Sequence, residues 1–380
     1  MEKYSKNSFE PKKTTIGIYG GDGLRGEPFS LLSSLTEGNI LSLAYDKPVP
    51  VQALSDVLGM PAAYVEPIVE KLVYGELMGK TPSGLVYTRC FVVNHKDSFG
   101  NVAAQEDVAD KYAERVWNII YENIKPLTET GTFLSFTEKQ KATMLLYVSR
   151  GILDRIVLKY THEKVKRPDL PSRPDAGNWL ATVTVFEPGE KRSKYDASGP
   201  VQVNYREPGT DRNLCQLFDY QSVFGDAHWA YGGFKYKCSL SSILRFYASF
   251  LPSGIQPDNA LLYELVPEFE KLRILRRDDD GEIRLDIPAL PYDDTPAWND
   301  AENKATEKLC GVLSDDLRKL VKEHKNKIPS YVDCAGYYTH RGALSAYTTA
   351  QLLSIVDKGL LPYKIEVGKT PLIYLAYRKA

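Results

Sequence analysis

The sequence lacks an excess of charge of either sign, and it is poor in residues that commonly hold metals. Its 380 residues include 48 Lys and Arg and 49 Asp and Glu, which gives a formal net charge of −1. This balance excludes a strongly basic nucleic-acid coat protein and a polybasic membrane binder, so any DNA contact must come from a local patch. The cysteines and histidines are dispersed, without a CxxC pair or metal-ligand spacing. We therefore expect reduced thiols, no metal site and no cofactor.

Long apolar runs and catalytic motifs are also absent. No segment approaches the about 18 consecutive apolar residues of a membrane span, and the polar first residues contain no apolar signal segment. We expect a cytoplasmic protein without a membrane partner. The GxSxG, HExxH and P-loop motifs do not occur, and paired carboxylates occur only in Asp-rich turns such as 278–280 and 293–294. The sequence thus indicates no catalytic residues, and we do not expect an enzyme.

The order of periodic segments predicts an α+β fold in four parts. A polar arm and a compact helical module occupy residues 1–92, and a helical connector follows at 93–172. Short runs rich in Val, Thr, Tyr and Phe predict a β-rich part at 173–238. Apolar residues at helical spacing return in residues 239–380 and predict a mainly helical C-terminal part.

A glycine-rich stretch near the start admits two interpretations. Gly21 to Gly26 match the GxGxxG pattern of dinucleotide-binding loops, and Asp46 lies about twenty residues further on. That reading needs residues 40–45 to form the second parallel strand, and the rest of the chain lacks the alternating strands and helices of such a fold. We favour a simple turn, and we keep a nucleotide-binding enzyme as the less favoured alternative.

Residues 39–92 carry the most informative pattern. A helix ends near Tyr45, a short helix runs from Val51 to Leu58, and Gly59 supplies the tight turn of a helix-turn-helix unit. The next helix has its buried face at helical spacing, formed by Val65, Ile68, Val69 and Leu72. A strand, a turn around Pro82 to Gly84 and a second strand follow. This order predicts a winged helix-turn-helix.

The run ILSLAYDKPVPVQALSDVLGMPAAYVEPIVEKLVYGELMGKTPSGLVYTR resembles a family of bacterial winged helix-turn-helix transcriptional regulators, some of which carry labels referring to RNA polymerase sigma factors. The resemblance covers residues 36–92. It is fainter over Arg173 to Trp179 and over 258–288. The resemblance implies DNA binding through the second helix of the motif and the wing.

The residues predicted to contact DNA carry little net positive charge. The outward face of the second helix offers Ala62, Ala63 and Glu66 to the base edges, and the hydroxyls of Thr81 and Ser83 lie on the wing. The candidates for phosphate contacts are Lys47, Lys71, Lys80 and Arg89. Acidic residues of the same segment offset these charges. The alternative is a winged helix that serves as a protein-protein interaction scaffold without base readout, for example with a component of the transcription apparatus.

Two later segments give further candidates. Residues 239–288 predict helices followed by a hairpin with an Asp-Gly turn, which suggests a second winged helix with Arg276, Arg277 and Arg284 on its wing; the alternative is an ordinary α+β subdomain. The aromatic-rich middle suggests a site for a small-molecule effector, and the alternative is that these aromatics fill a core. The candidate ligand residues are Trp179, Tyr220, His228, Trp229 and Tyr231.

A helix predicted over 103–125 carries a long apolar stripe. The stripe consists of Val108, Tyr112, Val116, Ile120 and Ile124. It either packs against a helix predicted over 137–161 or against a second copy of the chain. Because DNA regulators usually place two modules on two half-sites, the second possibility predicts a homodimer.

Overall fold

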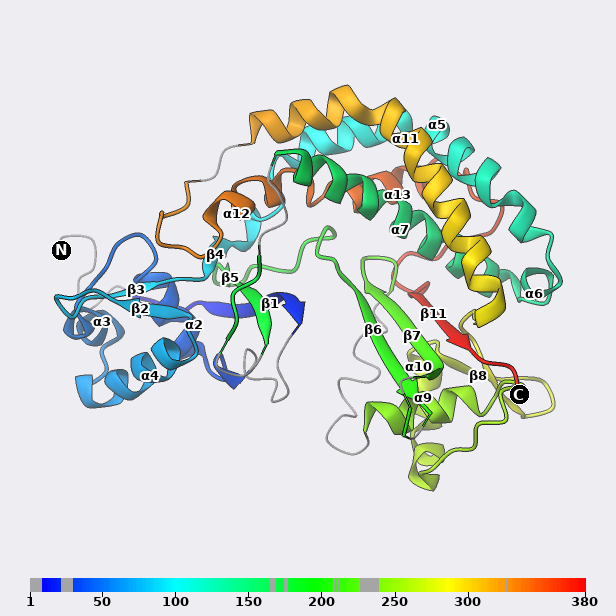
Figure 1. The fold of residues 1–380 in the computed structure, drawn as a ribbon, viewed down its shortest axis with the longest axis horizontal. Helices are drawn as coiled ribbons and strands as arrows, with labels where there is room; N and C mark the ends of the chain where they lie inside the picture. Colours follow the sequence, from blue (N-terminus) through cyan, green and yellow to red (C-terminus); the bar gives the residue numbers. More distant parts are fainter. Residues whose placement is uncertain are drawn as a thin grey trace. The chain divides into compact units, whose positions relative to one another are not determined.

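The structure, a computed structural model, describes residues 9–21, 30–164, 169–173, 177–207, 209–210, 212–225, 239–324 and 327–380. With 49% helix and 18% strand it belongs to the α+β class, as predicted. The chain forms two compact units, which Figure 1 shows. Unit 1 contains residues 1–101, 160–192 and 318–345, and unit 2 contains residues 102–159, 193–317 and 346–380. The units therefore do not follow the predicted boundaries at 92, 172 and 238, because each unit is assembled from three separate stretches.

Unit 1 is built around a three-stranded sheet. Its strands are β1 (Lys13–Gly21), β5 (Asn178–Phe186) and β4 (Phe91–Asn94), in the order β1-β5-β4. Strand β1 is antiparallel to β5, and β4 is parallel to it. Residues 40–43, which the dinucleotide interpretation needs as a strand, lie in a helix. The dinucleotide interpretation is therefore not supported, and residues 22–26 of its glycine motif lie outside the described residues.

Beside this sheet lie three helices and a hairpin, in the order expected for residues 39–92. They are α2 (Leu35–Leu43), α3 (Val51–Leu58), α4 (Ala62–Tyr74), β2 (Met78–Lys80) and β3 (Val86–Thr88). A capping box of Ser34 and Glu37 starts α2, and Gly59, with a φ of 65°, ends α3 in the left-handed conformation that glycine adopts readily. The side chains of Val65, Val69 and Leu72 are buried, as the helical period predicts.

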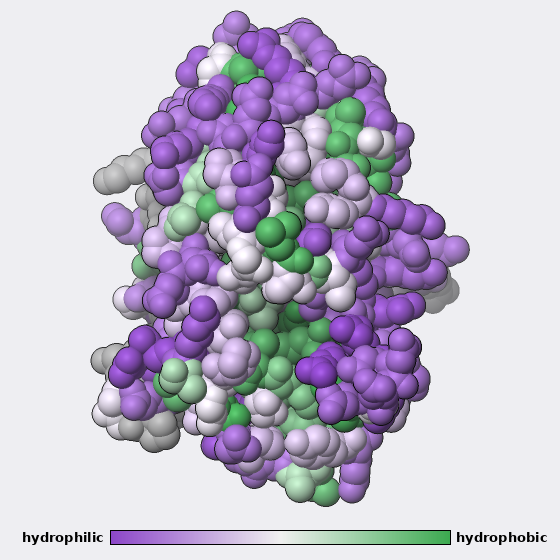
Figure 2. Space-filling view, turned by 90° about the vertical axis from the view of Figure 1, so that its right-hand side faces the viewer, coloured by the Kyte–Doolittle hydropathy of each residue, from purple (hydrophilic) through white to green (hydrophobic). Residues whose placement is uncertain are grey.

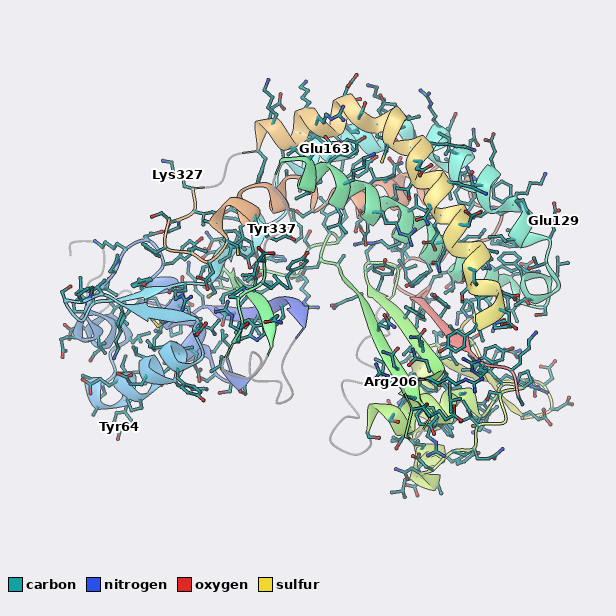
Figure 3. The ribbon with its side chains drawn as sticks, in the orientation of Figure 1. Tyr64, Glu129, Glu163, Arg206, Lys327 and Tyr337 are labelled. Carbon is teal, nitrogen blue, oxygen red and sulfur yellow. The ribbon has the colours of Figure 1, made fainter. Side chains whose placement is uncertain are left out.

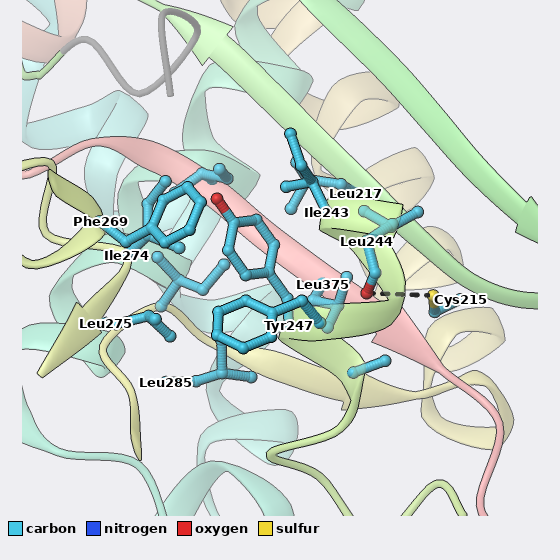
Figure 4. Close-up of a cluster of buried hydrophobic side chains, with 14 of the residues drawn as sticks. Cys215, Leu217, Ile243, Leu244, Tyr247, Phe269, Ile274, Leu275, Leu285 and Leu375 are labelled. Carbon is cyan, nitrogen blue, oxygen red and sulfur yellow. Dashed lines mark hydrogen bonds between the residues drawn. The ribbon is translucent and has the colours of Figure 1, made fainter. Parts of the chain in front are cut away.

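Unit 2 has a four-stranded sheet and a second hairpin. The strands β6 (Ser198–Arg206), β7 (Asn213–Gln221), β10 (Ala289–Pro291) and β11 (Leu372–Tyr377) follow the order β10-β11-β7-β6. Helix α9 (Leu240–Ala248), the 3₁₀ helix η2 (Ala260–Leu265), helix α10 (Val266–Lys271) and the hairpin strands β8 (Leu275–Arg277) and β9 (Ile283–Leu285) complete this part. Figure 4 shows the core between them, in which Tyr247 packs near Phe269, Leu275 and Leu285.

Two of the sequence predictions need correction here. The helix expected over 257–272 is a 3₁₀ segment followed by only six α-helical residues. The β-rich part expected at 173–238 is not one domain, because β5 joins the sheet of unit 1 whereas β6 and β7 join that of unit 2. The first difference follows from Pro267 in the first turn of α10, and the second from strand pairing that local periodicity does not reveal.

The remaining helices range from 4 to 29 residues in length. They are α5 (Val102–Thr128), α6 (Gly131–Leu134), α7 (Glu138–Lys164), α11 (Thr295–Glu323), α12 (Ala335–Arg341) and α13 (Tyr347–Asp357), with the 3₁₀ turns η1 (His95–Asp97), η3 (Tyr292–Asp294) and η4 (Gly342–Leu344). The two helices predicted over 103–125 and 137–161 are thus present. Helix α5 packs against α13 within unit 2, and Val116, Ile120 and Ile124 of the apolar stripe are buried there. Among the described residues, no helix is long and apolar enough to cross a membrane.

Arg173 ties distant segments of unit 1 together. Its buried guanidinium donates to the Trp179 carbonyl oxygen at 3.0 Å and lies over the Trp179 ring. It also pairs with Glu76 at 3.1 Å and with Asp333 at 3.3 Å. Asp333 in turn pairs with Arg89 at 3.1 Å. Glu76 has a φ of 59°, a conformation that costs a non-glycine residue energy and is held here by the contacts of its side chain and carbonyl with Arg173.

We expect Arg173→Met to lower the free energy of unfolding by about 1.5–3 kcal/mol, because it removes the charged donor to the Trp179 and Glu76 carbonyl oxygens, while Arg89 still pairs with Asp333. The matched control is Lys304→Met, which removes an exposed pair with Asp300 on α11 and should cost at most about 1 kcal/mol. Urea unfolding followed by circular dichroism measures both. An equal, small effect of the two changes would show that Arg173 does not hold unit 1 together.

Candidate nucleic-acid interface

The candidate interface is formed by the outer face of α4 and the tip of the hairpin in unit 1. The buried residues Val65, Val69 and Leu72 fix the orientation of α4. Ala63 and Glu66 are consequently exposed, as predicted, whereas Ala62 is half-buried. Sequence reasoning missed Tyr64, whose side chain is 68% exposed and projects from α4 in Figure 3. The same helical period predicts an outward position for Tyr64, but tyrosine is not among the basic and amide side chains that most often contact base edges.

The hairpin is tight, and a third segment is attached to it. Val49 and Val86 exchange two backbone hydrogen bonds of 2.8 Å, so the stretch before α3 runs beside β3. At the tip, the Thr81 amide donates to the Leu85 carbonyl oxygen, and Gly84 has a φ of 83°. The Thr81 and Ser83 hydroxyls lie 2.9 Å apart and bond each other. They are placed to donate to an anion once that mutual bond is given up.

The four side chains predicted to bind phosphates differ in whether they already have an ion-pair partner. Lys47 is exposed. Lys71 pairs with Glu37 at 3.2 Å, and Lys80 pairs with Glu70. Arg89 is held at the base of the hairpin by Asp333. Three of the four thus already have a carboxylate partner within unit 1, and Lys47 and Lys80 are the better placed for an outside contact because Arg89 belongs to the Arg173 network.

The partner of Lys71 is a firmly charged group. Burial by itself would raise the pKa of Glu37, but hydrogen bonds from the Ser34 side chain and from Lys71 outweigh it and lower the pKa. The side chain of Glu37 is only 7% exposed. Lys71 therefore neutralises a buried carboxylate and is unsuited to a phosphate contact that would require it to leave.

The aromatic residues proposed for an effector site do not come together in one unit. Trp179 belongs to unit 1, where it is buried beneath Arg173, and Tyr220 belongs to unit 2, where it is buried against Tyr147. Both fill cores, as the alternative interpretation held. His228, Trp229 and Tyr231 lie outside the described residues.

Other polar sites in the described part of the chain are small. No group of three or more His, Cys, Asp and Glu side chains could hold a metal ion there. A pocket of about 180 Å³ between α5 and α13 in unit 2 is lined by charged residues. Two of its three carboxylates are paired, Glu106 with Lys194 at 3.0 Å and Asp110 with Lys358 at 2.8 Å. These ion pairs make the pocket part of the packing between the two helices.

One buried carboxyl group has an unusual pKa. Glu302 on α11 in unit 2 is 8% exposed, and burial raises its pKa from 4.5 to about 7, although Arg155, 2.6 Å away, opposes the shift. The sequence gives no signal for this group, since its burial depends on α7 and β11 residues far away in the chain. It lies in unit 2 and takes no part in the interface of unit 1.

Comparison with protein-family models, with curated proteins and with solved structures gives no match to this chain. The function must therefore be argued from the fold and the chemistry of its surfaces.

Glu302 predicts a specific pH dependence of stability. The folded state favours the protonated carboxyl, so its contribution is complete at pH values below about 4.3 and is lost as the pH rises through about 7. At pH 8 the loss amounts to about 3 kcal/mol. Glu302→Gln should remove this dependence. The free energy of unfolding of the variant, compared with that of the wild type, should therefore be higher at pH 8 than at pH 5.

Unfolding by urea at both pH values measures the difference between wild type and variant. The control is Glu307→Gln, an exposed position on the same helix, which should leave the pH dependence unchanged. Parallel behaviour of the Glu302 variant and the wild type would contradict the raised pKa.

Proposed function

We propose that residues 35–88 form a winged helix that binds DNA, and that the protein is a transcriptional regulator of the cytoplasm. The observation that carries this proposal is the order of α2, α3, α4 and the β2-β3 hairpin, together with the pairing of Val49 with Val86. In winged helices the two helices around the tight turn present the second one to the major groove, and the wing touches the backbone. Here that second helix is α4.

The exposed face of α4 suits a close approach to DNA. Ala62 and Ala63 are small and can contact a thymine methyl group, and Glu66 can accept from cytosine N4. The Tyr64 hydroxyl adds a donor on the same exposed face. On the wing, Lys80, Thr81 and Ser83 are placed for phosphate contacts, with Lys47 before α3.

The electrostatics predict modest affinity. Glu70 holds Lys80 by an ion pair at the surface, and Glu66 and Glu70 face the same side as the proposed DNA. Each phosphate neutralised adds to the affinity and to its dependence on salt. Because few of the basic side chains are free of an ion pair, non-specific DNA binding should be weak, and Glu70 should weaken it further.

A protein partner is the second candidate, and one observation favours it. Tyr64 and Tyr74 on α4 are 68% and 74% exposed, and exposed aromatic residues are enriched at protein interfaces. A component of the transcription apparatus would suit such a scaffold. The proposal includes no enzyme activity and no cofactor.

The double change of Lys47 and Lys80 to Ala should weaken binding to all duplexes alike. It should also lower the slope of log affinity against log salt by about two, close to one for each lost phosphate contact. Fluorescence anisotropy with a labelled duplex of mixed sequence, titrated at several KCl concentrations, measures both. Lys304→Ala on α11 is the matched control and should change neither.

An unchanged slope in the double variant, with DNA still bound, would show that this hairpin is not the contact surface. If the wild type binds no duplex at any salt concentration, DNA is not the partner and the protein scaffold takes precedence.

A further inference from the structure

The hairpins of the two units are built to the same plan. The Leu77 amide donates a hydrogen bond to the Leu72 carbonyl oxygen. In the same way, the Ile274 amide donates to the Phe269 carbonyl oxygen, and both bonds are 3.0 Å long. The residues just before, Glu76 and Arg273, have φ values of 59° and 60°, and the tip glycines Gly84 and Gly281 have 83° and 80°. Each residue of the second hairpin follows its counterpart in the first by the same number of positions, as Gly281 follows Gly84. The two hairpins can therefore be matched residue by residue.

The match extends through the preceding helix. The buried residues Val65, Val69 and Leu72 of α4 correspond at the same separation to buried residues of unit 2, namely Leu262, Val266 and Phe269. The exposed Tyr64 corresponds to Leu261, which is 60% exposed. Burial and exposure therefore repeat together, which a chance likeness between two hairpins would not produce.

The sheets repeat as well. In unit 1, β5 lies between the antiparallel β1 and the parallel β4; in unit 2, β11 lies between the antiparallel β7 and the parallel β10. After β4 come η1 and the 27-residue α5, and after β10 come η3 and the 29-residue α11. Residues 13–186 and 213–377 are thus two copies of one arrangement, copy 1 and copy 2.

Each copy lends a segment to the unit of the other. Unit 2 contains residues 102–159 of copy 1, and unit 1 contains residues 318–345 of copy 2. In unit 1, the amide of Asp333 donates to the carbonyl oxygen of Arg89 at the base of the hairpin.

In unit 2, the counterpart of Arg89 is Asp286. There, Gln140 donates to the Leu285 and Ile287 carbonyl oxygens at 3.0 Å, and Lys139 pairs with Asp286. The segment after the long helix of each copy therefore closes the hairpin of the other, with the charges of the ion pair reversed.

The long helices of the two copies also contact each other. Lys111 of α5 bonds Asp316 of α11 at 2.7 Å, and Lys308 of α11 bonds Asn123 of α5 at 3.0 Å. Lys111 and Lys308 are counterparts at the separation found for the hairpins. Their partners, Asp316 and Asn123, lie four positions away from being counterparts, so the contacts only approximate those of a two-fold interface between identical subunits.

We propose that this chain is the covalent equivalent of a homodimer with exchanged segments, and that one chain carrying a single DNA-binding face is the functional unit. The first statement follows from the duplication and the reciprocal contacts. It removes the need for the predicted homodimer, because Val116, Ile120 and Ile124 of the α5 stripe are buried within the chain, while Val108 and Tyr112 are half-buried. The second statement rests on the proposed function and on the differences between the copies.

Copy 2 has lost the chemistry that would let it hold DNA. Among the described residues between α9 and η2 there is no helix to match α3. The tip Thr81-Pro82-Ser83 is replaced by Asp278-Asp279-Asp280, which phosphates would repel. Two of the three arginines on its hairpin are paired, Arg277 with Glu270 at 3.2 Å and Arg284 with Asp278 at 3.1 Å, and the third, Arg276, is half-buried. In Figure 2, hydrophilic side chains cover most of the visible face, around a smaller hydrophobic area.

Cleavage of the folded chain between the copies tests the fused dimer without DNA. Lys191 and Arg192 are both exposed and lie between β5 and β6, so a protease site inserted there is cut after folding. The intact protein should have a mass near 42.7 kDa in light scattering. After cleavage, both fragments should stay in one particle of that mass and separate only in denaturant. Native separation into two folded fragments, or a stable dimer of intact chains at micromolar concentration, would overturn the proposal.

A matched pair of variants tests the single face. Glu70 holds Lys80 in copy 1, and Glu270 holds Arg277, the counterpart of Lys80, in copy 2. On a duplex that the wild type binds, Glu70→Gln should raise the affinity about threefold or more at low salt, whereas Glu270→Gln should leave it unchanged. An equal gain from both changes would overturn the single face. Absence of DNA binding by the wild type would overturn the proposed function and the single face together, while the cleavage result decides the fused dimer separately.

Discussion

The buried guanidinium of Arg173 is the contact on which the architecture of unit 1 depends. It joins the residue that turns the chain into the hairpin, Glu76, to the start of β5 and to Asp333, a residue of the other copy. A buried cation of this kind is tolerated only because carboxylates and carbonyl oxygens surround it. This joint, together with the core that α4 shares with β5, positions α4 and its hairpin against the sheet, and with them the exposed face that we propose for DNA.

In unit 2, the ion pair at the base of the hairpin has its charges reversed. At the base of its hairpin Asp286 stands where unit 1 has Arg89, and it is met by Lys139 instead of an acid. Because a mismatched pairing would place Asp333 beside Asp286 or Lys139 beside Arg89, each segment fits only the hairpin that it contacts. We infer that these charges favour the native assignment of each segment to its unit, a role that ion pairs fill in some proteins.

Local signals sufficed for part of this architecture. The helical period and the glycine turn predicted α3, α4 and the hairpin, since these elements depend on neighbours in the sequence. The helix expected over 257–272 starts late because Pro267 lacks the amide proton that a helix interior needs and is accepted only at the helix start. Long-range pairing was invisible: Arg89 looked like a phosphate contact, and its partner Asp333 lies 244 residues away. The duplication was also missed, because it is preserved in burial and backbone geometry more than in residue identity.

We expect a regulator that carries two copies of a module and uses one of them to bind DNA. A selection of bound fragments from random and genomic DNA, carried out at about 50 mM salt so that weak phosphate contacts are retained, tests this most directly. We expect an enriched motif that covers one major-groove site, lacks two-fold symmetry and is occupied by one chain per duplex. A palindromic motif with two half-sites, or no enrichment over the input, would contradict the account.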